Sequence, residues 1–418
     1  MAKKTINKEL TGAQDLYNFL FEACNIIRGP VSQDNFKDYI TPLLYYKRIS
    51  DVYDEETEEA LISSGGDKEY ASLPEQHRFV IPDGCHWQEV RERTENLGAA
   101  IVGAMRQIEI ANPDTLYGVL SMFSSQKWTN KAILNDSKIR DLIEHLSKRK
   151  LGNKDYPADL MGDAYEILLK KFADDSKAQA GEFYTPRSVV RLLVHILDPQ
   201  PGETVYDPAC GSGGMLIEAI RYMHDDSLCC GSIFGQEKNV VNAAIAKMNL
   251  FLHGASDFNV MQGDTLRDPK ILQGGNIAKF DCVIANPPFS LENWGATEWS
   301  SDKYKRNIYG TPSDSCGDYA WIQHMICSMS SGKGRMAVVM PQGILFRGNQ
   351  EAEIRKQLVE SDLIEAVVTL GDKLFYGTGL SPCFLIIRRM KQAHHSGRIL
   401  MIDGSKILTQ KRAQNILE

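Results

Sequence analysis

Long apolar runs are missing from this 418-residue sequence. No stretch approaches the roughly 18 apolar residues that a membrane-spanning helix needs. The first residues, Met1 to Leu10, are polar and lack the apolar core of a secretory signal peptide. We therefore expect a cytoplasmic protein that does not bind a membrane.

The spacings that hold metal ions are missing as well. The nine cysteines include no C-x-x-C pair, Cys229 and Cys230 are adjacent, and the histidines include no H-x-x-x-H pair. Because zinc sites depend on such spacings, we expect no metal ion. The cysteines are predicted to be reduced and mostly buried thiols.

A strong excess of one sign of charge is also absent. The 47 Lys and Arg residues against 54 Asp and Glu residues give 47 − 54 = −7, which does not by itself indicate a nucleic-acid binder. The acidic cluster at residues 51–59 is typical of a solvated helix face. Eight Lys and Arg residues between Lys127 and Lys154 could contact phosphates or could form another solvated face.

What is present is an ordinary globular composition, with 43% hydrophobic and 24% charged residues. This composition excludes disordered, collagen-like and disulfide-scaffold proteins. The length predicts two or three domains at roughly 150 residues each. There is no low-complexity segment and no repeat of fixed period.

The first part of the chain has helical periodicity and no clear strand alternation. Apolar residues recur at helical spacing from Leu16 to Ile27, and Gly29 and Pro30 should end that helix. Similar patterns return at residues 36–49, 99–110 and 133–146. The sequence therefore predicts a helical N-terminal domain over residues 1–154.

From residue 155 to residue 418, short apolar runs alternate with helical segments. Strands are predicted at residues 203–206, 232–235, 258–261, 281–285, 335–340, 363–370, 383–387 and 399–402. Helices are predicted at residues 215–223, 240–253, 319–329 and 351–359. This alternation indicates an α/β domain with a doubly wound, mostly parallel sheet. In such a sheet, ligands bind beyond the carboxyl ends of the strands.

The first strand leads into a glycine-rich turn at residues 207–214, DPACGSGG, followed by an apolar helix. Glycine lets the backbone bend sharply and approach a ligand, and the helix N-terminus offers free N–H groups. A nicotinamide dehydrogenase is one alternative. However, Leu216 stands where the third glycine of a dinucleotide fingerprint would fall, which argues against it.

Carboxyl groups follow the next two strands. Glu237 ends the second strand, where an acid can accept hydrogen bonds from ribose hydroxyls, and Asp264 follows the third. Either acid alone could be a surface residue or a helix cap. Together with Asp207 and the glycine turn, they predict a pocket for an adenosine with a non-phosphate tail, because no lysine or arginine faces it at the turn.

The fourth strand ends in Asn286, Pro287, Pro288 and Phe289. Two prolines restrict the backbone, so the Asn286 side chain and the Pro287 carbonyl have fixed directions. These two oxygens can accept both N–H bonds of an exocyclic amino group and leave its lone pair free to attack a methyl donor. Phe289 could stack on the base. The structural alternative is a strand-ending turn with a core phenylalanine.

A further motif, GEFYTPR at residues 181–187, precedes a helix predicted at residues 188–197. Thr185 followed by Pro186 is a good N-cap and first helical residue. Capping does not explain the acid and the two aromatic residues that come before them.

Together, these motifs resemble the amino-methylating DNA methyltransferases that use S-adenosylmethionine. The closer resemblance is to the modification subunit of type I restriction-modification systems. The matching motifs are GEFYTPR, DPACGSGGML, the acid of GQEKN, Asp264, ANPPF and GDYAW. The segments LYNFLFEACNIIRG and YITPLLYYKRISDVYDEE also resemble the helical N-terminal domain of that family.

The resemblance implies an S-adenosylmethionine-dependent methyltransferase fold and a role for each motif residue. The residues that would border the methyl donor are Glu182, Phe183, Tyr184, Thr185, Pro186 and Arg187, with Tyr184 and Thr185 near its methionine end. Its amino acid part would be bound by Asp207, Ser212, Gly213 and Gly214. Glu237 would hold the ribose, and Asp264 would contact the adenine of the donor. The target adenine, flipped from the duplex, would be held by Asn286, Pro287, Pro288 and Phe289.

The resemblance also implies partners. Family members act on double-stranded DNA with a separate specificity subunit, commonly two modification subunits per specificity subunit, and a restriction subunit can join. Sequence reading by a partner would agree with the modest net charge. Family chains usually continue into a helical region that meets the specificity subunit, and we expect that contact to be incomplete in a sequence that stops at Glu418.

Other functions fit part of the same pattern. The same oxygens could hold the N4 amino group of cytosine, and an N-P-P motif could hold a glutamine amide of a protein. A non-catalytic scaffold that keeps only the donor-binding fold is the alternative from another class, and the intact Asn286 and Phe289 argue against it.

Overall fold

The computed structural model describes residues 2–116, 118–120, 125–175, 185–223, 231–255, 257–372, 374–375, 380–409 and 416–417. The chain divides into two units, one of residues 1–179 and 247–254 and the other of residues 180–246 and 255–418. We keep the predicted boundary between residues 154 and 155 as a proposal for where the catalytic domain begins.

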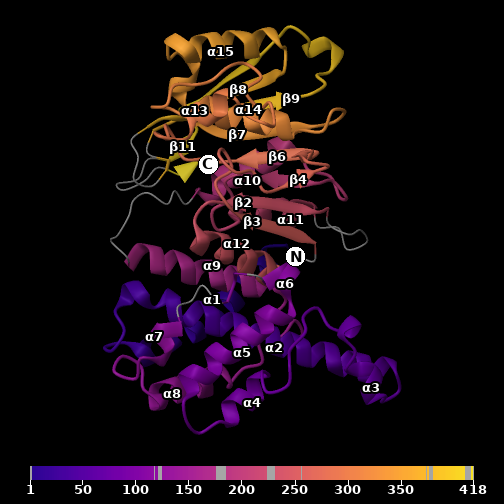
Figure 1. Cartoon of the computed structure of the whole chain (residues 1–418), viewed down its shortest axis with the longest axis vertical. Coiled ribbons are helices and arrows are strands. Elements are labelled where there is room, and N and C mark those ends of the chain that lie inside the picture. The colour runs from indigo at the N-terminus through magenta and orange to yellow at the C-terminus, as the bar shows by residue number, and fades with distance from the viewer. Residues whose placement is uncertain are drawn as a thin grey trace. The chain divides into compact units, whose positions relative to one another are not determined.

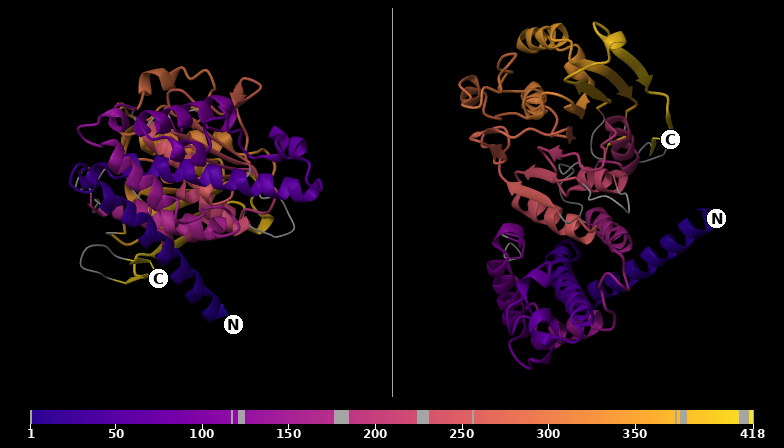
Figure 2. Two further views of the ribbon diagram at one scale, coloured as in Figure 1. Left: turned by 90° about the horizontal axis from the view of Figure 1, so that it is seen from below. Right: turned by 90° about the vertical axis from the view of Figure 1, so that its right-hand side faces the viewer.

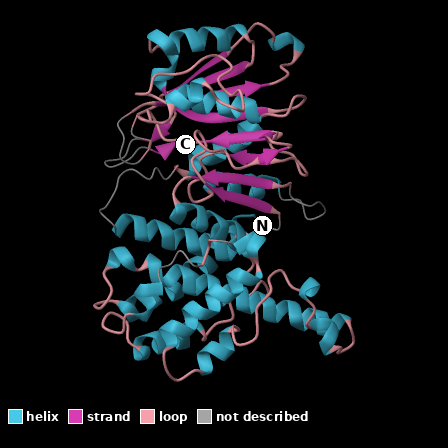
Figure 3. Ribbon diagram, viewed as in Figure 1, coloured by secondary structure: helices cyan, strands magenta, loops and turns pink. Residues whose placement is uncertain are grey.

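Helices make up the described part of the first unit (Figure 3). They are α1 (Ala2–Ile27), α2 (Lys37–Ser63), α3 (Lys68–Ala71), α4 (Trp87–Glu92), α5 (Leu97–Ala111), α6 (Pro113–Leu116), α7 (Ser125–Thr129), α8 (Asp136–Leu146) and α9 (Ala158–Asp175), with the 3-10 turns η1 (Gln33–Asn35) and η2 (Pro74–Gln76). Helix α1 ends just before Gly29, which has a left-handed φ of 103°, as the sequence predicts. The predicted helical N-terminal region is confirmed.

The core of this unit forms around α2. Every residue from Tyr39 to Val52 is buried, including the charged Arg48. Nη1 of the Arg48 guanidinium donates to the carbonyls of Leu151 and Tyr156. The loop that leads to α9 is thereby tied to the middle of α2.

The second unit contains an eight-stranded sheet with the order β10-β8-β9-β7-β6-β1-β2-β3. Its strands are β1 (Val205–Asp207), β2 (Ile233–Glu237), β3 (Phe258–Gln262), β6 (Cys282–Ala285), β7 (Arg335–Pro341), β8 (Ile364–Leu370), β9 (Pro382–Arg388) and β10 (Leu400–Gly404). Strand β9 is antiparallel to both of its neighbours, and the other pairs are parallel. The predicted doubly wound, mostly parallel sheet is confirmed (Figure 1). All eight predicted strands form.

Helices flank this sheet on both faces (Figure 2). They are α10 (Arg187–Leu197), α11 (Gly214–Met223), α12 (Val240–Leu252), α13 (Ala296–Ser300), α14 (Asp318–Ser328) and α15 (Asn349–Glu360), with the 3-10 turns η3 (Gln342–Leu345) and η4 (Ala393–His395). Two short antiparallel strand pairs, β4 (Leu272–Gln273) with β5 (Asn276–Ile277) and β11 (Leu408–Thr409) with β12 (Ile416–Leu417), were not predicted. Each of these strands has only two residues, which are too few to show the alternation of apolar and polar side chains that predicts a strand.

The central strand β6 is buried along its whole length. Val283 and Ala285 belong to the apolar core that contains α14, and alternation directs Cys282 and Ile284 to the opposite face. A strand covered on both faces must be apolar throughout, which explains the continuous run of residues 282–285. Its first polar side chain, Asn286, comes where the strand leaves the core.

Candidate active site

The strand order reverses between β1 and β6. From β1 the chain proceeds to β2 and β3 on one side, and it then crosses to β6 and β7 on the other. Strands β1 and β6 are adjacent and parallel, with Val205 opposite Cys282. The glycine turn after β1 and the Asn-Pro-Pro-Phe loop after β6 therefore leave the same edge of the sheet. Such a reversal point is where open α/β sheets bind ligands.

The glycine turn is built by backbone hydrogen bonds. Asp207 accepts from the N–H of Ala209 at 2.9 Å through Oδ1, and the N–H of Cys210 donates to the carbonyl of Gln236 at 3.0 Å. Gly211 and Gly213 have left-handed φ values of 53° and 85°, which a side chain would disfavour. Helix α11 begins at the next residue, so the turn presents its N-terminus to the edge of the sheet.

Two carboxyl groups face this turn from the ends of β1 and β2. Glu237 accepts the N–H of Gly211 at 3.0 Å and the N–H of Asn239 at 2.7 Å. Asp207 is only 2% exposed. Burial raises the pKa of Asp207 to about 8, the N–H of Ala209 opposes this shift, and the negative charge of Glu237 adds to it. A cation placed beside Asp207 would offset the cost of ionising this buried carboxyl group.

Asp264 lies at the neighbouring strand end. The N–H of Gly263 donates to the carbonyl of Glu237 at 2.9 Å, which brings the two acids to adjacent strand ends. Oδ1 of Asp264 accepts from the N–H groups of Leu266 and Arg267, both at 3.2 Å. Its other oxygen lies 2.9 Å from Nζ of the exposed Lys238. The sequence argument did not place a lysine here.

A buried arginine supports the turn after Asp264, and sequence reasoning missed it. The Arg306 guanidinium donates to the carbonyls of Thr265 at 2.8 Å and Leu266 at 2.7 Å. It also forms a bidentate ion pair with Asp302, from Nε to Oδ2 at 2.9 Å and from Nη2 to Oδ1 at 2.8 Å. Thr265 in turn donates from Oγ1 to the carbonyl of Pro208 at 2.6 Å. This network joins the Asp264 turn to the glycine turn.

The network continues to His324. Burial lowers the pKa of His324 well below its usual value, and the positive charge of Arg306 adds to the effect. The ring is therefore neutral. Because Arg306 can only donate, Nδ1 of His324 accepts from it at 3.2 Å, and Nε2 carries the proton and faces the Tyr206 hydroxyl at 3.2 Å. No motif marks Arg306, since its partners are backbone carbonyls and a carboxylate four residues away.

Asn286 carries an unsatisfied acceptor. Its Nδ2 donates to Oγ1 of Thr185 at 2.9 Å, whereas its buried Oδ1 has no hydrogen-bond partner among the described residues. An unpaired buried acceptor is costly and usually marks a ligand position or a water site. The predicted N-cap role of Thr185 is wrong, because α10 begins at Arg187, with Pro186 at the N-cap and no side-chain cap bond. The Thr185 hydroxyl serves Asn286 instead.

The rest of the loop is graded in exposure. Pro287 is buried, Pro288 is exposed and Phe289 is half-buried. The Phe289 ring meets the buried Phe375 at 64°, with centroids 6.1 Å apart. Because Phe289 is only half-buried, it is not a core phenylalanine, and part of its ring is available for stacking.

The other predicted positions are placed as follows. Ser212 is half-buried, Gly213 is buried and Gly214 is exposed, all at the start of α11. Pro186 is half-buried and Arg187 is exposed. Glu182, Phe183 and Tyr184 lie outside the described residues.

Comparisons with known proteins identify the family. Residues 156–418 match the family model of N-6 DNA methylase, which is more than half of the chain. The chain belongs to the N-6 DNA methylase family. Residues 16–146 match the HsdM N-terminal domain, so both parts of this methylase-family chain have a counterpart.

Individual relatives agree with this assignment. The type I restriction enzyme MjaVII methylase subunit of Methanocaldococcus jannaschii is 34% identical over 381 residues, which are 87% of this chain and 63% of that protein. The chain thus spans less than two thirds of that relative's length. The type I restriction-modification system methyltransferase subunit from Streptococcus thermophilus has 26% identity and a TM-score of 0.79, over 97% of this chain and 90% of that chain. A Listeria monocytogenes protein assigned to the class I S-adenosylmethionine-dependent methyltransferases shares the fold at 15% identity, with a TM-score of 0.52, over 73% of this chain and 93% of that chain.

Several charged side chains of the helical unit have partners within that unit. Lys154 lies 2.9 Å from Glu58, and Arg149 lies 2.6 Å from Asp15. Glu55 accepts from two backbone N–H groups, at residues 153 and 154. The acidic cluster and part of the basic stretch therefore stabilise the loop at residues 149–154, which favours the structural alternative for these side chains.

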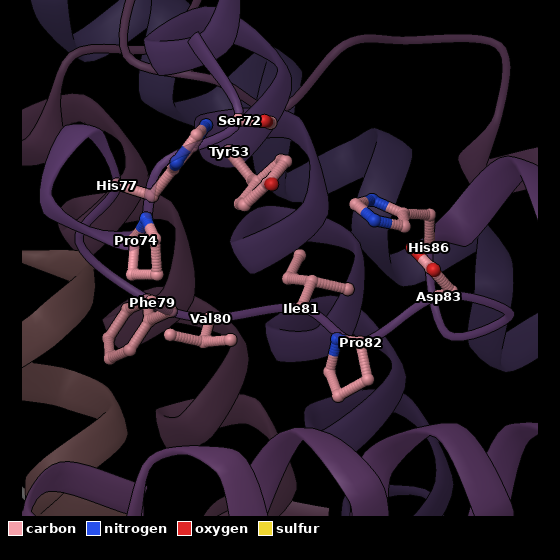
Figure 4. A pocket seen from close by; sticks show the side chains of 10 residues that line it. All are labelled: Tyr53, Ser72, Pro74, His77, Phe79, Val80, Ile81, Pro82, Asp83 and His86. Atoms are coloured by element: carbon pink, nitrogen blue, oxygen red, sulfur yellow. The ribbon is translucent and has the colours of Figure 1, made fainter. Parts of the chain in front are cut away.

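The helical unit also contains a pocket of about 330 Å³ (Figure 4). Tyr53 and His77 stack beside it with ring centroids 3.8 Å apart. The two ring nitrogens of His77 lie 2.8 Å from Oγ1 of Thr57 and 3.0 Å from the carbonyl of Leu73. His77 is thus held in the packing of α2 and its neighbouring loop.

The described residues also bear on metal binding and on membrane insertion. They contain no group of three or more His, Cys, Asp or Glu side chains that could hold a metal ion. No helix within the same ranges has the length and apolar character to cross a bilayer.

Proposed function

We propose that this chain transfers a methyl group from S-adenosylmethionine to the N6 amino group of adenine in double-stranded DNA. It would act as the modification subunit of a type I restriction-modification complex. The observation that carries the proposal is the buried, unpaired Oδ1 of Asn286, at the sheet edge that also bears the glycine turn. An amino group of a base would supply the missing donor.

The residues for the methyl donor fit its chemistry. S-adenosylmethionine supplies an electrophilic methyl group and carries an α-ammonium group. The buried Asp207, beside Ser212, Gly213 and Gly214, would hold that ammonium group, which would favour the ionised carboxylate. Glu237 would bind the ribose and Asp264 the donor's adenine. Residues 182–187 would border the donor, with Thr185 at the side of Asn286.

The residues for the target base fit an amine nucleophile. The Oδ1 of Asn286 and the carbonyl of Pro287 would accept the two N–H bonds of the amino group, so that its lone pair can face the methyl group. The ring of Phe289 would stack on the flipped base, a contact worth about 1–3 kcal/mol. Positioning of two bound reactants supplies the acceleration without a metal ion or a covalent enzyme intermediate.

The family match favours adenine N6 over cytosine N4 and over a protein glutamine. The relatives are named as methylase subunits of type I restriction enzymes, which supports a specificity subunit and a restriction subunit as partners. The proposed assembly has two modification subunits per specificity subunit. Their DNA substrate would place this chain in the cytoplasm.

The test measures methyl transfer by the chain with and without the specificity subunit of its source genome. Unmethylated DNA is incubated with S-adenosylmethionine that carries a labelled methyl group, then digested, and the methylated nucleosides are identified by mass spectrometry. We expect N6-methyladenine from the complex and none from the Asn286→Ala variant. N4-methylcytosine, or full activity of that variant, would contradict the proposal.

A further inference from the structure

The residue after the Asn-Pro-Pro-Phe loop has an unusual backbone. Ser290 has a left-handed φ of 50°, a conformation that residues other than glycine rarely adopt. Its N–H donates to Oδ1 of Asp318 at 2.7 Å. Asp318 is the first residue of α14 and is fully buried. The turn that follows Phe289 is therefore held by a carboxylate from another element.

The second oxygen of Asp318 is held by an arginine. Arg347 donates from Nη2 to Oδ2 of Asp318, and its Nη1 lies 3.4 Å from Oγ of Ser290. Its Nε pairs with Glu351 at 2.7 Å, within one turn of the start of α15. One guanidinium thus connects the loop after β6, the start of α14 and the start of α15.

This arrangement has a physical reason. A buried carboxylate without a cation is strongly disfavoured, so Asp318 depends on Arg347. A left-handed Ser290 persists only where its surroundings hold it, and the Asp318 hydrogen bond does so. Because Phe289 and Ser290 are consecutive, movement of this turn would displace the ring and the loop back to Asn286.

We propose that Asp318 and Arg347 are positioning residues for the target base: they hold the turn at Ser290 and thereby the direction of the Asn286–Phe289 loop. They do not touch the reacting atoms. The inference rests on the proposed function and deepens it, because it assigns the geometry of the base site to a charge pair outside the Asn-Pro-Pro-Phe loop. Misplacement of about 1 Å in such a site can lower a rate about 100-fold.

The test uses Arg347→Ala, the conservative Arg347→Lys, and Arg388→Ala as a matched control. The Arg388 side chain is exposed to a similar degree as that of Arg347, and it forms an ion pair with Glu365. Arg388 lies opposite Arg335, at the start of β7, and thus at the other end of the strands from this loop. For each variant of the full chain, hydrogen exchange of the peptide covering residues 286–291 and the Kd for S-adenosylmethionine are measured. The kcat and KM values are measured in the complex with the specificity subunit.

We expect Arg347→Ala to speed exchange in residues 286–291 and to lower kcat about 10- to 100-fold, since positioning is lost. The Kd and KM for S-adenosylmethionine should stay within about threefold of wild type, because the donor residues lie on other strand ends. Arg347→Lys should recover part of kcat, and Arg388→Ala should match wild type in all four quantities.

Other outcomes overturn the inference. Unchanged exchange in Arg347→Ala would show that the pair does not hold the loop, and faster exchange with unchanged kcat would show that the hold does not position the base. If Arg347→Ala weakened S-adenosylmethionine binding by the same factor as it lowered kcat, the variant would be generally damaged and the inference would fail. If wild type transfers no methyl group to DNA, the proposed function fails, and the exchange comparison still decides whether Asp318 and Arg347 hold this loop.

Discussion

The side chain of Asn286 donates from Nδ2 to Oγ1 of Thr185 at 2.9 Å, and its Oδ1 stays unpaired among the described residues. Thr185 precedes α10, whereas Asn286 follows β6, so two motifs about 100 residues apart meet in one hydrogen bond. This contact fixes which end of the amide is left to accept a donor. In the proposed reaction, the free oxygen is the end that the target amino group requires.

The first prediction concerns that contact. Thr185→Val keeps the shape but removes the hydroxyl, so the Asn286 amide can rotate and offer its N–H₂ to the amino group. We expect kcat to fall about tenfold, the cost of one neutral hydrogen bond of about 1.4 kcal/mol. Thr185→Ser should retain most of the activity. Equal activity of the Val and Ser variants, measured by methyl transfer in the complex, would show that the hydroxyl does not orient Asn286.

The second prediction follows from the pKa of Asp207, which is raised to about 8 by burial and then by the charge of Glu237. With its pKa near 8, Asp207 should be mostly protonated at pH 7 before the donor binds, and the α-ammonium group of the donor would favour the carboxylate. Binding should therefore release a proton, and affinity should rise with pH up to about 8. Calorimetry at pH 7 in buffers with different ionisation enthalpies measures the released proton.

The variant Asp207→Asn separates binding from stability. It should weaken donor binding at least about tenfold by loss of a charge-assisted hydrogen bond, and binding should no longer release a proton. The folded state of wild type keeps this proton up to pH about 8, whereas the unfolded chain loses it near pH 4. The stability of wild type therefore decreases as the pH rises from about 4 to about 8. At pH 8 the ligand-free variant should melt no lower than wild type. Unchanged donor affinity would remove Asp207 from the pocket.

The third prediction concerns Arg306, which supports the Asp264 turn through Thr265 and Leu266. Arg306→Met leaves Asp302 without its cation and should destabilise the protein by about 3–5 kcal/mol. Adding Asp302→Leu should recover much of that loss, since an apolar pair of similar volume can replace a buried ion pair. Both the single and the double variant should bind S-adenosylmethionine more weakly than wild type, because the carbonyls of Thr265 and Leu266 lack the N–H groups of Arg306. Recovery of both stability and affinity would contradict this role.

The fourth prediction concerns a site at the other end of the strands. Arg335 binds both oxygens of Glu203, at 3.2 and 2.6 Å, and donates to the carbonyls of Leu197 and Asp198. Burial favours a higher pKa for Glu203, but the hydrogen bond from Arg335 and that from the N–H of Gln200 outweigh it and lower the pKa to about 2. The stabilisation is present above pH about 4.3 and is lost as the pH falls toward 2.

Glu203→Gln should therefore lower the free energy of unfolding at pH 7 by about 3–5 kcal/mol, since Arg335 stays buried without its partner. The difference from wild type should shrink at pH 3, and donor affinity should be unchanged at pH 7. Urea unfolding at both pH values and calorimetry with S-adenosylmethionine measure these quantities. A stability loss of the same size at both pH values would contradict the assignment.

The sequence was sufficient for features that depend on local pattern. Continuous apolar runs such as residues 282–285 mark buried parallel strands, and the glycines at 211 and 213 mark a turn with left-handed φ. Asp207, Glu237 and Asp264 were placed at one edge because the carboxyl ends of parallel strands share an edge. The N-cap prediction for Thr185 is wrong because α10 begins one residue later than the Thr-Pro spacing indicates, at Arg187. The contact of the Thr185 hydroxyl with Asn286 is not visible in local spacing.

Sequence alone thus determined the class of the fold, the strand ends that bear the motifs and the family to which they point, because these depend on residue type and near-neighbour spacing. Only the tertiary structure decided which groups hold those motifs in place: Thr185 on Asn286, Arg306 on the Asp264 turn, and Arg347 with Asp318 on Ser290. The physical reason is that such contacts join residues 28 to 101 positions apart, many of them through backbone atoms, which every residue carries.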